Sequence, residues 1–201
     1  MITLYSNPRC ANSHKTRLVL AEKELPVTTV ELDDDKNLPD DFLKINPYGK
    51  LPTIIDRDDI FFEPTIINEY LDERYPHPPL KPGTPANRAK MRIAVQHIEN
   101  EIYPLYFNWE KVKKKSEPMK KIRAYLKTLN NHLESASWFV AEQYTLADIT
   151  LTPALYRLRT TANSLDMKQW PHLNSYMDRL FERPAFDQSL SDYEDMLRQK
   201  F

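Results

Sequence analysis

Residues 46–53 read Asn-Pro-Tyr-Gly-Lys-Leu-Pro-Thr, and this stretch decides how the first part of the chain folds. Its end forms an apolar run, Leu51–Ile55, which is followed after four polar residues by a second apolar run, Ile60–Phe62. Two short apolar runs that are separated by a polar turn predict a β-hairpin. A short helix is expected just before the stretch, over Pro39–Ile45. The stretch therefore joins a helix to a hairpin.

The segments on both sides of this hairpin complete a small α/β pattern. Alternating apolar residues predict strands, and apolar residues at helical spacing predict helices. The expected strands are Ile2–Tyr5 and Val27–Leu32, and the expected flanking helices are Ser13–Lys23 and Pro64–Tyr75. The resulting order, βαβαββα, is typical of one small α/β domain. We therefore predict a first domain over residues 1–77.

Beyond residue 84 the pattern is helical throughout. Thr84 followed by Pro85 is a helix start, since threonine caps a helix and proline suits its first position. Residues 145–148, Thr-Leu-Ala-Asp, form a second start that is similar to a capping box. Further helices are expected over residues 118–136, 171–182 and 184–198. The sequence thus predicts an α/β domain followed by an all-α domain over residues 84–201.

Composition and charge exclude several classes of function. The 201 residues are 41% hydrophobic and 28% charged, and no apolar run is long enough to span a bilayer. The N-terminus carries no basic and apolar leader, so we expect a cytoplasmic protein. The net charge of −1 gives no field that would draw the whole protein onto nucleic acid. Any effect on a gene is therefore expected to act through another protein.

The scarce cysteine and glycine residues exclude further kinds of site. The single cysteine, Cys10, cannot form an internal disulfide, and no multi-cysteine metal site is possible. The five histidines show no metal-ligand spacing, so no metal is expected. Gly49 and Gly83 are the two glycines, which is too few for a glycine-rich phosphate loop. No nucleotide cofactor is implied.

A proline-rich stretch follows the last predicted helix of the first domain. Residues 69–80 read Glu-Tyr-Leu-Asp-Glu-Arg-Tyr-Pro-His-Pro-Pro-Leu, so that prolines bracket His77. Proline fixes its backbone φ angle and lacks an N–H donor, which keeps such a segment extended at little entropic cost on binding. The stretch can be a plain interdomain linker or a stiff exposed surface that presents His77 to a partner.

Taken together, these segments resemble the glutathione S-transferase fold over essentially the whole chain. Residues 46–53 are similar to the family segment in which a cis proline, here Pro52, turns the preceding backbone toward the thiol peptide. Residues 145–148 match the helix start of the family's second domain. Glu63 stands where the family has an acidic residue before the helix that binds the γ-glutamyl group. The resemblance implies a thioredoxin-like N-terminal domain and a helical C-terminal domain.

The same resemblance defines the residues that glutathione chemistry would use. Transferases of this fold activate the glutathione thiol with a Tyr, Ser or Cys side chain near the N-terminus of the first helix. Cys10 and Ser13 occupy that place, although the usual proline after the cysteine is missing. The remaining glutathione-site equivalents are Leu51, Pro52, Glu63 and Pro64.

Pro64 opposes a glutathione cofactor. Family members that bind glutathione usually have serine here, which donates a hydroxyl and a backbone N–H to the γ-glutamyl carboxylate. Proline offers neither donor, and each charge-assisted bond contributes roughly 1.5 to 3 kcal/mol. The same proline also suits the first position of a helix. We expect no bound cofactor and no catalysis.

Within that fold, residues 69–80 are similar to a signature of the stringent starvation protein A family of bacterial regulators. Residues 19–23 and 180–183 are similar to the same family. This resemblance implies a homodimer or related-subunit dimer that binds RNA polymerase holoenzyme in a stress or starvation response. The implied contact residues are Tyr75, Pro76, His77, Pro78, Pro79 and Leu80.

Two alternatives remain open from the sequence. One is a glutathione-dependent transferase or thiol reductase that uses Cys10 or Ser13. The other is a scaffold that binds an anionic small molecule at the dimer cleft through the lysine-rich residues 111–123. That lysine-rich run is also typical of a solvated helix junction.

Overall fold

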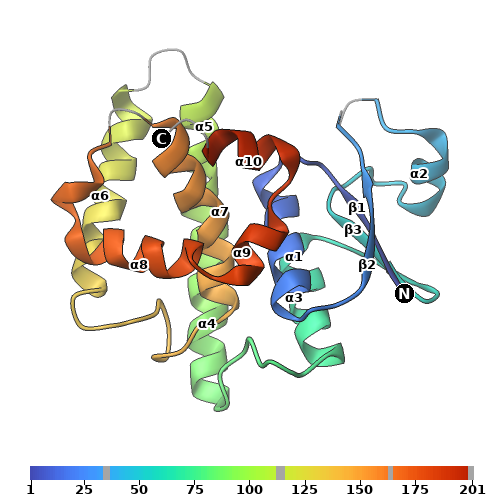
Figure 1. The fold of residues 1–201 in the computed structure, drawn as a ribbon, viewed down its shortest axis with the longest axis horizontal. Helices are drawn as coiled ribbons and strands as arrows, with labels where there is room; N and C mark the ends of the chain where they lie inside the picture. Colours follow the sequence, from blue (N-terminus) through green and yellow to red (C-terminus); the bar gives the residue numbers. More distant parts are fainter. Residues whose placement is uncertain (34–36, 112–115, 163–164, 199–201) are drawn as a thin grey trace. The chain divides into compact units, whose positions relative to one another are not determined.

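A computed structural model describes residues 1–33, 37–111, 116–162 and 165–198 of the chain (Figure 1). These residues divide into two compact units. The first unit contains Met1–Pro79 together with the C-terminal segment that begins at Pro184, and the second contains Leu80–Arg183. Each unit has its own core and is described by itself.

The first unit is built on a mixed four-stranded sheet with the order β2-β1-β3-β4. Strand β1 pairs parallel with β2 and antiparallel with β3, and β3 pairs antiparallel with β4. The strands are β1 (Ile2–Ser6), β2 (Val27–Glu31), β3 (Thr53–Asp56) and β4 (Asp59–Phe62). The predicted hairpin is confirmed.

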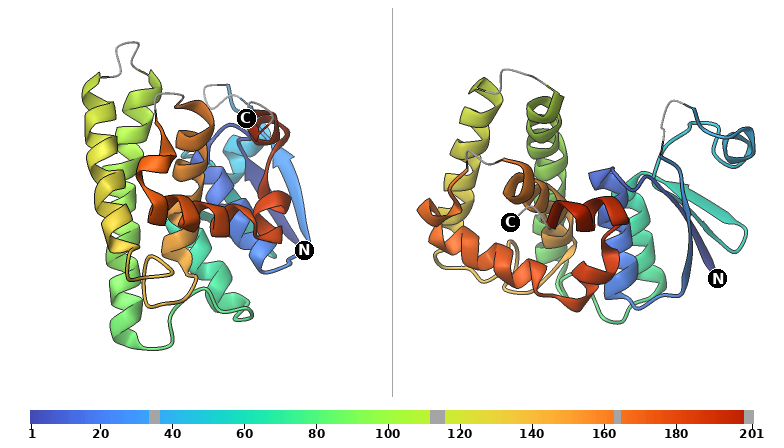
Figure 2. Two further views of the ribbon diagram at one scale, coloured as in Figure 1. Left: turned by 60° about the vertical axis from the view of Figure 1, so that its left-hand side comes forward. Right: turned by 45° about the horizontal axis from the view of Figure 1, so that its top comes forward.

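Helices cover both faces of this sheet. Helices α1 (Ala11–Glu22) and α3 (Pro64–Arg74) lie together on one face, as Figure 2 shows. Helix α2 (Asp40–Ile45) covers the other face, where the rings of Tyr5 and Phe42 lie 5.1 Å apart. The order βαβαββα and the thioredoxin-like architecture are as predicted. The core lies along the two central strands, because β1 and β3 carry the buried side chains of the sheet whereas the residues of β2 are exposed.

The C-terminal helices α9 (Pro184–Ser189) and α10 (Asp192–Arg198) belong to the first unit. The sequence placed residues 184–201 in the helical domain because their periodicity is helical. In the structure α9 packs on α1, and the Ser191 hydroxyl donates a 2.6 Å hydrogen bond to the Pro8 carbonyl. Periodicity identifies a helix, but its packing partner depends on side-chain contacts that are distant in sequence.

Within its described residues, the second unit consists of helices joined by loops, and no strand is found there. Its helices are α4 (Pro85–His97), η1 (Ile98–Ile102, a π-helical turn), α5 (Tyr103–Lys111), α6 (Ser116–His132), α7 (Leu146–Thr161), η2 (Met167–Gln169) and α8 (Pro171–Phe181). Helix α7 is buried along most of its length and forms the centre of this unit. The residues Met91, Val95, Ile98, Ile102 and Leu105 recur at helical spacing, which predicts a core face. The first four are buried, whereas Leu105 is half-buried.

A buried capping box begins α7. The Asp148 carboxylate accepts hydrogen bonds from the Thr145 N–H at 2.8 Å and from the Phe139 N–H at 2.9 Å. It also accepts from the Tyr176 hydroxyl at 2.7 Å. Burial raises the pKa of Asp148 above its ordinary value, and these hydrogen bonds oppose that shift. The predicted helix start at Thr145 is confirmed.

Candidate protein-binding site

The proline loop, residues 75–80, follows helix α3 and contains the boundary between the two units, which lies after Pro79. Residues 76–79 are exposed, whereas Tyr75 is half-buried. Leu80 is only 2% exposed, and its carbonyl accepts a 2.9 Å hydrogen bond from the Leu146 N–H. Leu80 therefore lies inside the second unit and is not available on the surface. The loop presents four residues, Pro76, His77, Pro78 and Pro79, instead of the six that the sequence proposed.

Lys23 lies beneath this loop, just after the end of α1. Its side chain is 0% exposed, and its ammonium donates a 2.6 Å hydrogen bond to Asp72 Oδ1. The same ammonium donates to the carbonyl of Tyr75 at 2.7 Å and to the carbonyl of Pro78 at 2.6 Å. The buried Lys23 ammonium thus holds both the C-terminal part of α3 and the proline loop.

Tyr75 is anchored to the sheet through its hydroxyl. The hydroxyl donates a 3.1 Å hydrogen bond to Asp56 Oδ2, and the Tyr70 hydroxyl donates to the same oxygen at 2.9 Å. Burial, together with the bond to Asp56, raises the pKa of Tyr75 above its ordinary value. Tyr75 is therefore a neutral donor at physiological pH, and its hydroxyl ties the start of the loop to the end of β3. The exposed residues Glu73 and Arg74 lie beside it.

The glutathione-site equivalents around Pro52 have the expected backbone. The Leu51–Pro52 peptide bond is cis, as predicted. The Asn46 side chain donates hydrogen bonds to the Lys50 carbonyl at 3.2 Å and to the Thr53 hydroxyl at 2.9 Å, which closes the turn before β3. The turn is therefore held from within, in the geometry that the resemblance predicted.

The start of α3 holds the two residues that the family resemblance places at the γ-glutamyl position. Glu63 lies just before the helix with a φ of 73°, and its carboxylate forms an ion pair with Lys50. Pro64 occupies the first position of α3. Because proline has no N–H, this position offers no backbone donor to a carboxylate. Both residues lie at the start of α3, where the sequence placed them.

Cys10 and Ser13 have different surroundings. Cys10 precedes α1 as its N-cap, is half-buried, and forms no side-chain capping hydrogen bond. Ser13 is 0% exposed, and its hydroxyl oxygen accepts a 3.1 Å hydrogen bond from the Asn7 N–H. Ser13 thus stabilises the loop between β1 and α1. Of the two predicted thiol-activating candidates, Cys10 alone has solvent access.

A buried polar cluster, which the sequence did not reveal, joins α1 to the C-terminal helices. His14 Nε2 lies 3.0 Å from Ser189 Oγ, and His14 Nδ1 lies 3.2 Å from Glu194 Oε1. The Arg17 guanidinium donates to Glu194 Oε2 at 2.6 Å. The order Ser-His-Glu is that of a hydrolytic triad, but Ser189, His14 and Glu194 are each at most 1% exposed. No substrate can reach the hydroxyl, so the cluster stabilises packing.

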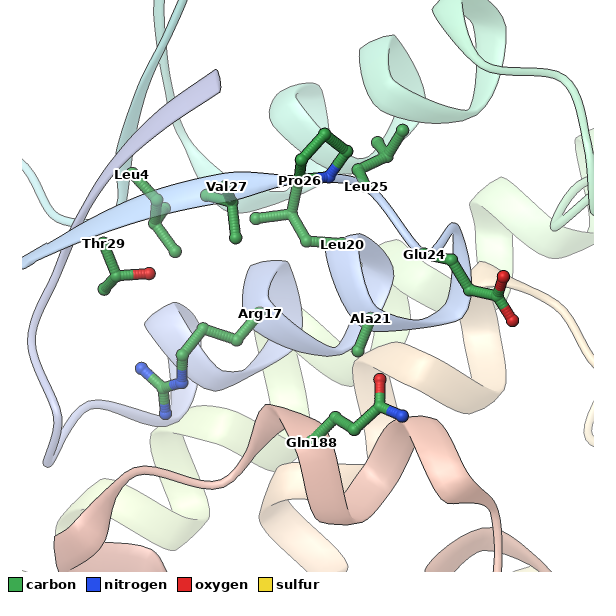
Figure 3. A pocket seen from close by; sticks show the side chains of 10 residues that line it. All are labelled: Leu4, Arg17, Leu20, Ala21, Glu24, Leu25, Pro26, Val27, Thr29 and Gln188. Carbon is green, nitrogen blue, oxygen red and sulfur yellow. The ribbon is translucent and has the colours of Figure 1, made fainter. Parts of the chain in front are cut away.

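A cavity of about 410 Å³ lies between α1, β2 and α9 (Figure 3). Its walls are mostly apolar, and its lining residues are Leu4, Arg17, Leu20, Ala21, Glu24, Leu25, Pro26, Val27, Thr29 and Gln188. The Arg17 guanidinium at its wall already donates to Glu194 and, at 2.6 Å, to the Ser6 hydroxyl. The cavity is lined by none of the predicted catalytic, glutathione-site or protein-binding residues, so it is separate from the predicted site.

Among the described residues, no group of three or more His, Cys, Asp and Glu side chains is placed to hold a metal ion. Across the same described ranges, no helix is both long enough and apolar enough to cross a membrane.

Comparison with known proteins establishes the class first. Residues 4–79 match the family described as "Glutathione S-transferase, N-terminal domain", and residues 88–184 match "Glutathione S-transferase, C-terminal domain". The Tau class glutathione S-transferase MiGSTU from mango, Mangifera indica, superposes with a TM-score of 0.85 at 22% identity, over 98% of this chain and 96% of that chain. The protein has the glutathione S-transferase fold.

Two full-length relatives define the family more narrowly. Both bear the name "Stringent starvation protein A homolog". The protein from Coxiella burnetii is 36% identical over 203 residues, covering 99% of this chain and 96% of the relative. The protein from Histophilus somni is 34% identical over 197 residues, covering 96% and 91%. The chain belongs to the stringent starvation protein A family.

Proposed function

We propose that this protein is a non-enzymatic transcription regulator of the stress or starvation response, which acts in the cytoplasm by binding RNA polymerase holoenzyme. The proposed contact surface is the exposed part of the proline loop, Pro76–Pro79. The proposal rests on the exposure of this loop in a chain that belongs to the stringent starvation protein A family. Four consecutive residues are exposed, whereas Tyr75 before them is half-buried and Leu80 after them is buried.

The physical argument rests on preorganisation. A segment that is already held in its bound conformation loses little conformational entropy when a partner binds. Prolines limit the backbone freedom of this loop, and the contacts of Lys23 and Tyr75 hold it from below. His77 is then presented on a stiff frame. The exposed side chains of Glu73 and Arg74 supply a polar rim of the kind that surrounds binding hot spots.

Three observations on the structure support the proposal that the protein does not catalyse glutathione chemistry. Pro64 removes the backbone donor at the γ-glutamyl position, Ser13 is buried in a structural hydrogen bond, and Glu63 is paired with Lys50. Cys10 retains solvent access, so a thiol reductase is the second candidate. Calorimetry with millimolar glutathione, run beside Cys10→Ser, tests it. Heat and turnover that both disappear in Cys10→Ser would establish this alternative.

We also propose a dimer, formed with a second copy or a related subunit. The first unit exposes large apolar side chains at Tyr48, Ile60 and Ile66, with exposed fractions of 73%, 43% and 59%. The Tyr48 ring packs on the ring of Phe62, with 5.1 Å between ring centroids. Phe62 is the last residue of β4, so Tyr48 is held against the end of that strand. Large exposed apolar groups of this kind favour an interface.

The experiment is a direct binding measurement with purified RNA polymerase holoenzyme. His77→Ala removes an exposed imidazole, so we expect unchanged folding and an affinity lowered by about tenfold or more, the usual effect at a central interface residue. His172→Ala is the matched control, because His172 is an exposed histidine on α8, in the second unit. Equal affinity of the His77→Ala and His172→Ala proteins would remove the proline loop from the interface.

A further inference from the structure

The Lys23 ammonium has all of its donors in use. A lysine ammonium has three N–H donors and no acceptor. Its three acceptors here are Asp72 Oδ1 at 2.6 Å, the Tyr75 carbonyl at 2.7 Å and the Pro78 carbonyl at 2.6 Å. The side chain is 0% exposed, so water does not compete for these bonds.

The proline loop cannot supply these bonds itself. Pro76, Pro78 and Pro79 lack backbone N–H groups, so three of the four exposed residues donate nothing. A buried carbonyl that lacks a donor is costly, and nearly all such groups in proteins are paired. Here the donor for the carbonyls of Tyr75 and Pro78 comes from a lysine that is distant in sequence. The shape of the loop therefore depends on a residue outside it.

The contact pattern distinguishes this arrangement from a plain buried ion pair. A lysine that served only to neutralise Asp72 would need one of its three donors for that carboxylate. The other two donors bind main-chain carbonyls at either side of His77, one before it and one after it. The ammonium therefore clamps the backbone on both sides of the exposed histidine.

We propose that Lys23 is a positioning residue for the polymerase-binding surface: its ammonium sets the backbone conformation in which Pro76–Pro79 are presented. This inference rests on the proposed function, and it extends that function from the surface to its internal support. Lys23 does not touch the partner. Its removal frees the loop to adopt other conformations, which must be restricted again on binding.

The test uses two variants of the full chain and two controls. Lys23→Met removes the charge but leaves the Asp72 carboxylate buried without this ammonium, which can prevent folding. The double variant Lys23→Met/Asp72→Leu removes both charges, and apolar replacement of a buried pair is often tolerated. Lys44→Met is the matched surface control, because Lys44 pairs with Asp41 while its side chain is 76% exposed. Phe42→Ala destabilises the first unit from the other face of the sheet.

The first readout needs no polymerase. The imidazole signal of His77 in the NMR spectrum is assigned by its loss in His77→Ala. In the double variant we expect the chemical shift of this signal to move toward its value in the unfolded chain. We also expect hydrogen exchange of the Tyr75 amide to accelerate by about tenfold or more, because a change of about 1.4 kcal/mol in the free energy of loop opening changes the opening equilibrium tenfold. In Lys44→Met and Phe42→Ala the His77 signal should stay in place. An unchanged His77 signal in the folded double variant overturns the inference.

The second readout is affinity for RNA polymerase holoenzyme. The double variant should bind about tenfold or more weakly, while Lys44→Met binds as the unmodified protein does. If the His77 signal moves but neither His77→Ala nor the double variant changes binding, the proposed function fails and the role of Lys23 in shaping the loop stands. If His77→Ala weakens binding and the double variant does not, the positioning role is overturned and the proposed function stands.

Discussion

Replacement of Asp148 by alanine should cost the second unit a large part of its stability. The carboxylate is 0% exposed and accepts hydrogen bonds from Thr145, Phe139 and Tyr176. Each buried donor that loses its acceptor costs about 1 to 3 kcal/mol. Phe139 is half-buried, so water can restore part of its bond. We therefore expect a loss of about 4 kcal/mol in the free energy of unfolding, from a total that is typically about 5 to 15.

The assay is urea denaturation followed by tryptophan fluorescence. Trp138 packs edge-on against Tyr176, with ring centroids 6.3 Å apart, so its emission reports on the environment of Asp148. Asp166→Ala is the matched control, because Asp166 caps η2 from an exposed position and accepts a 3.0 Å bond from the Lys168 N–H. Its loss should be about 1 kcal/mol or less. Equal losses for the two variants would refute the reasoning.

The pH dependence tests the electrostatic part of this reasoning. Burial raises the pKa of Asp148 in the folded protein above the value of about 3.9 expected when unfolded. A raised pKa means that protonation of this group favours the folded state as the pH falls through the folded pKa toward the unfolded one. The stability of the unmodified protein relative to Asp148→Asn should therefore increase between pH 7 and pH 4. A relative stability that decreases on acidification would mean that the hydrogen bonds outweigh burial.

Three further substitutions test the first unit. Gly49→Ala should lower stability by about 1 to 2 kcal/mol in a urea titration, because Gly49 has a φ of +61° and an added Cβ would lie 3.1 Å from Leu38. Tyr75→Phe should cost about 1 kcal/mol by the same method, since it removes the hydroxyl bond to Asp56; an unchanged midpoint would show that this bond is not stabilising. Tyr48→Glu should shift the proposed dimer toward monomer in sedimentation, and an unchanged sedimentation profile would exclude this aromatic face from the interface.

Local patterns predicted most of the elements of the fold. The hairpin, the first-unit helices and the start of α7 depend on turn residues, periodicity and capping, which neighbouring residues determine. The helix predicted over residues 184–198 contains a second capping signal. Residues 191–194, Ser-Asp-Tyr-Glu, form a capping box in which the Ser191 N–H donates to Glu194 at 3.0 Å. This start divides the predicted helix over residues 184–198 into α9 and α10.

The packing of α9 and α10 could not be predicted from these patterns. His14 and Arg17 on α1 bind Glu194, which is about 180 residues further along the chain. Nothing in the spacing of a single histidine, arginine or glutamate shows that they meet in the folded protein. Neither the helical pattern nor the family resemblance separated this C-terminal segment from the helical domain predicted over residues 84–201.

The exposure of the candidate-site residues also has some causes that are local in the sequence and others that are distant. The prolines and His77 are exposed because proline-rich segments after a helix seldom pack into a core, and composition alone indicated this. The inward position of Leu80 depends on Leu146, and the anchoring of Tyr75 depends on Asp56. These partners lie in other elements, so the sequence suggested a six-residue surface where the structure presents four exposed residues.

Residues 19–23 and residues 69–80 are two separate segments that resemble one family, and Lys23 joins these segments. Its ammonium bonds connect the end of α1 to the end of α3 and to the proline loop. A surface and its support should respond differently to substitution. His77→Ala should change binding with little effect on stability, whereas Lys23→Met should change both, because it also breaks a buried pair. The ratio of the two effects therefore separates residues that contact the partner from residues that hold the surface in shape.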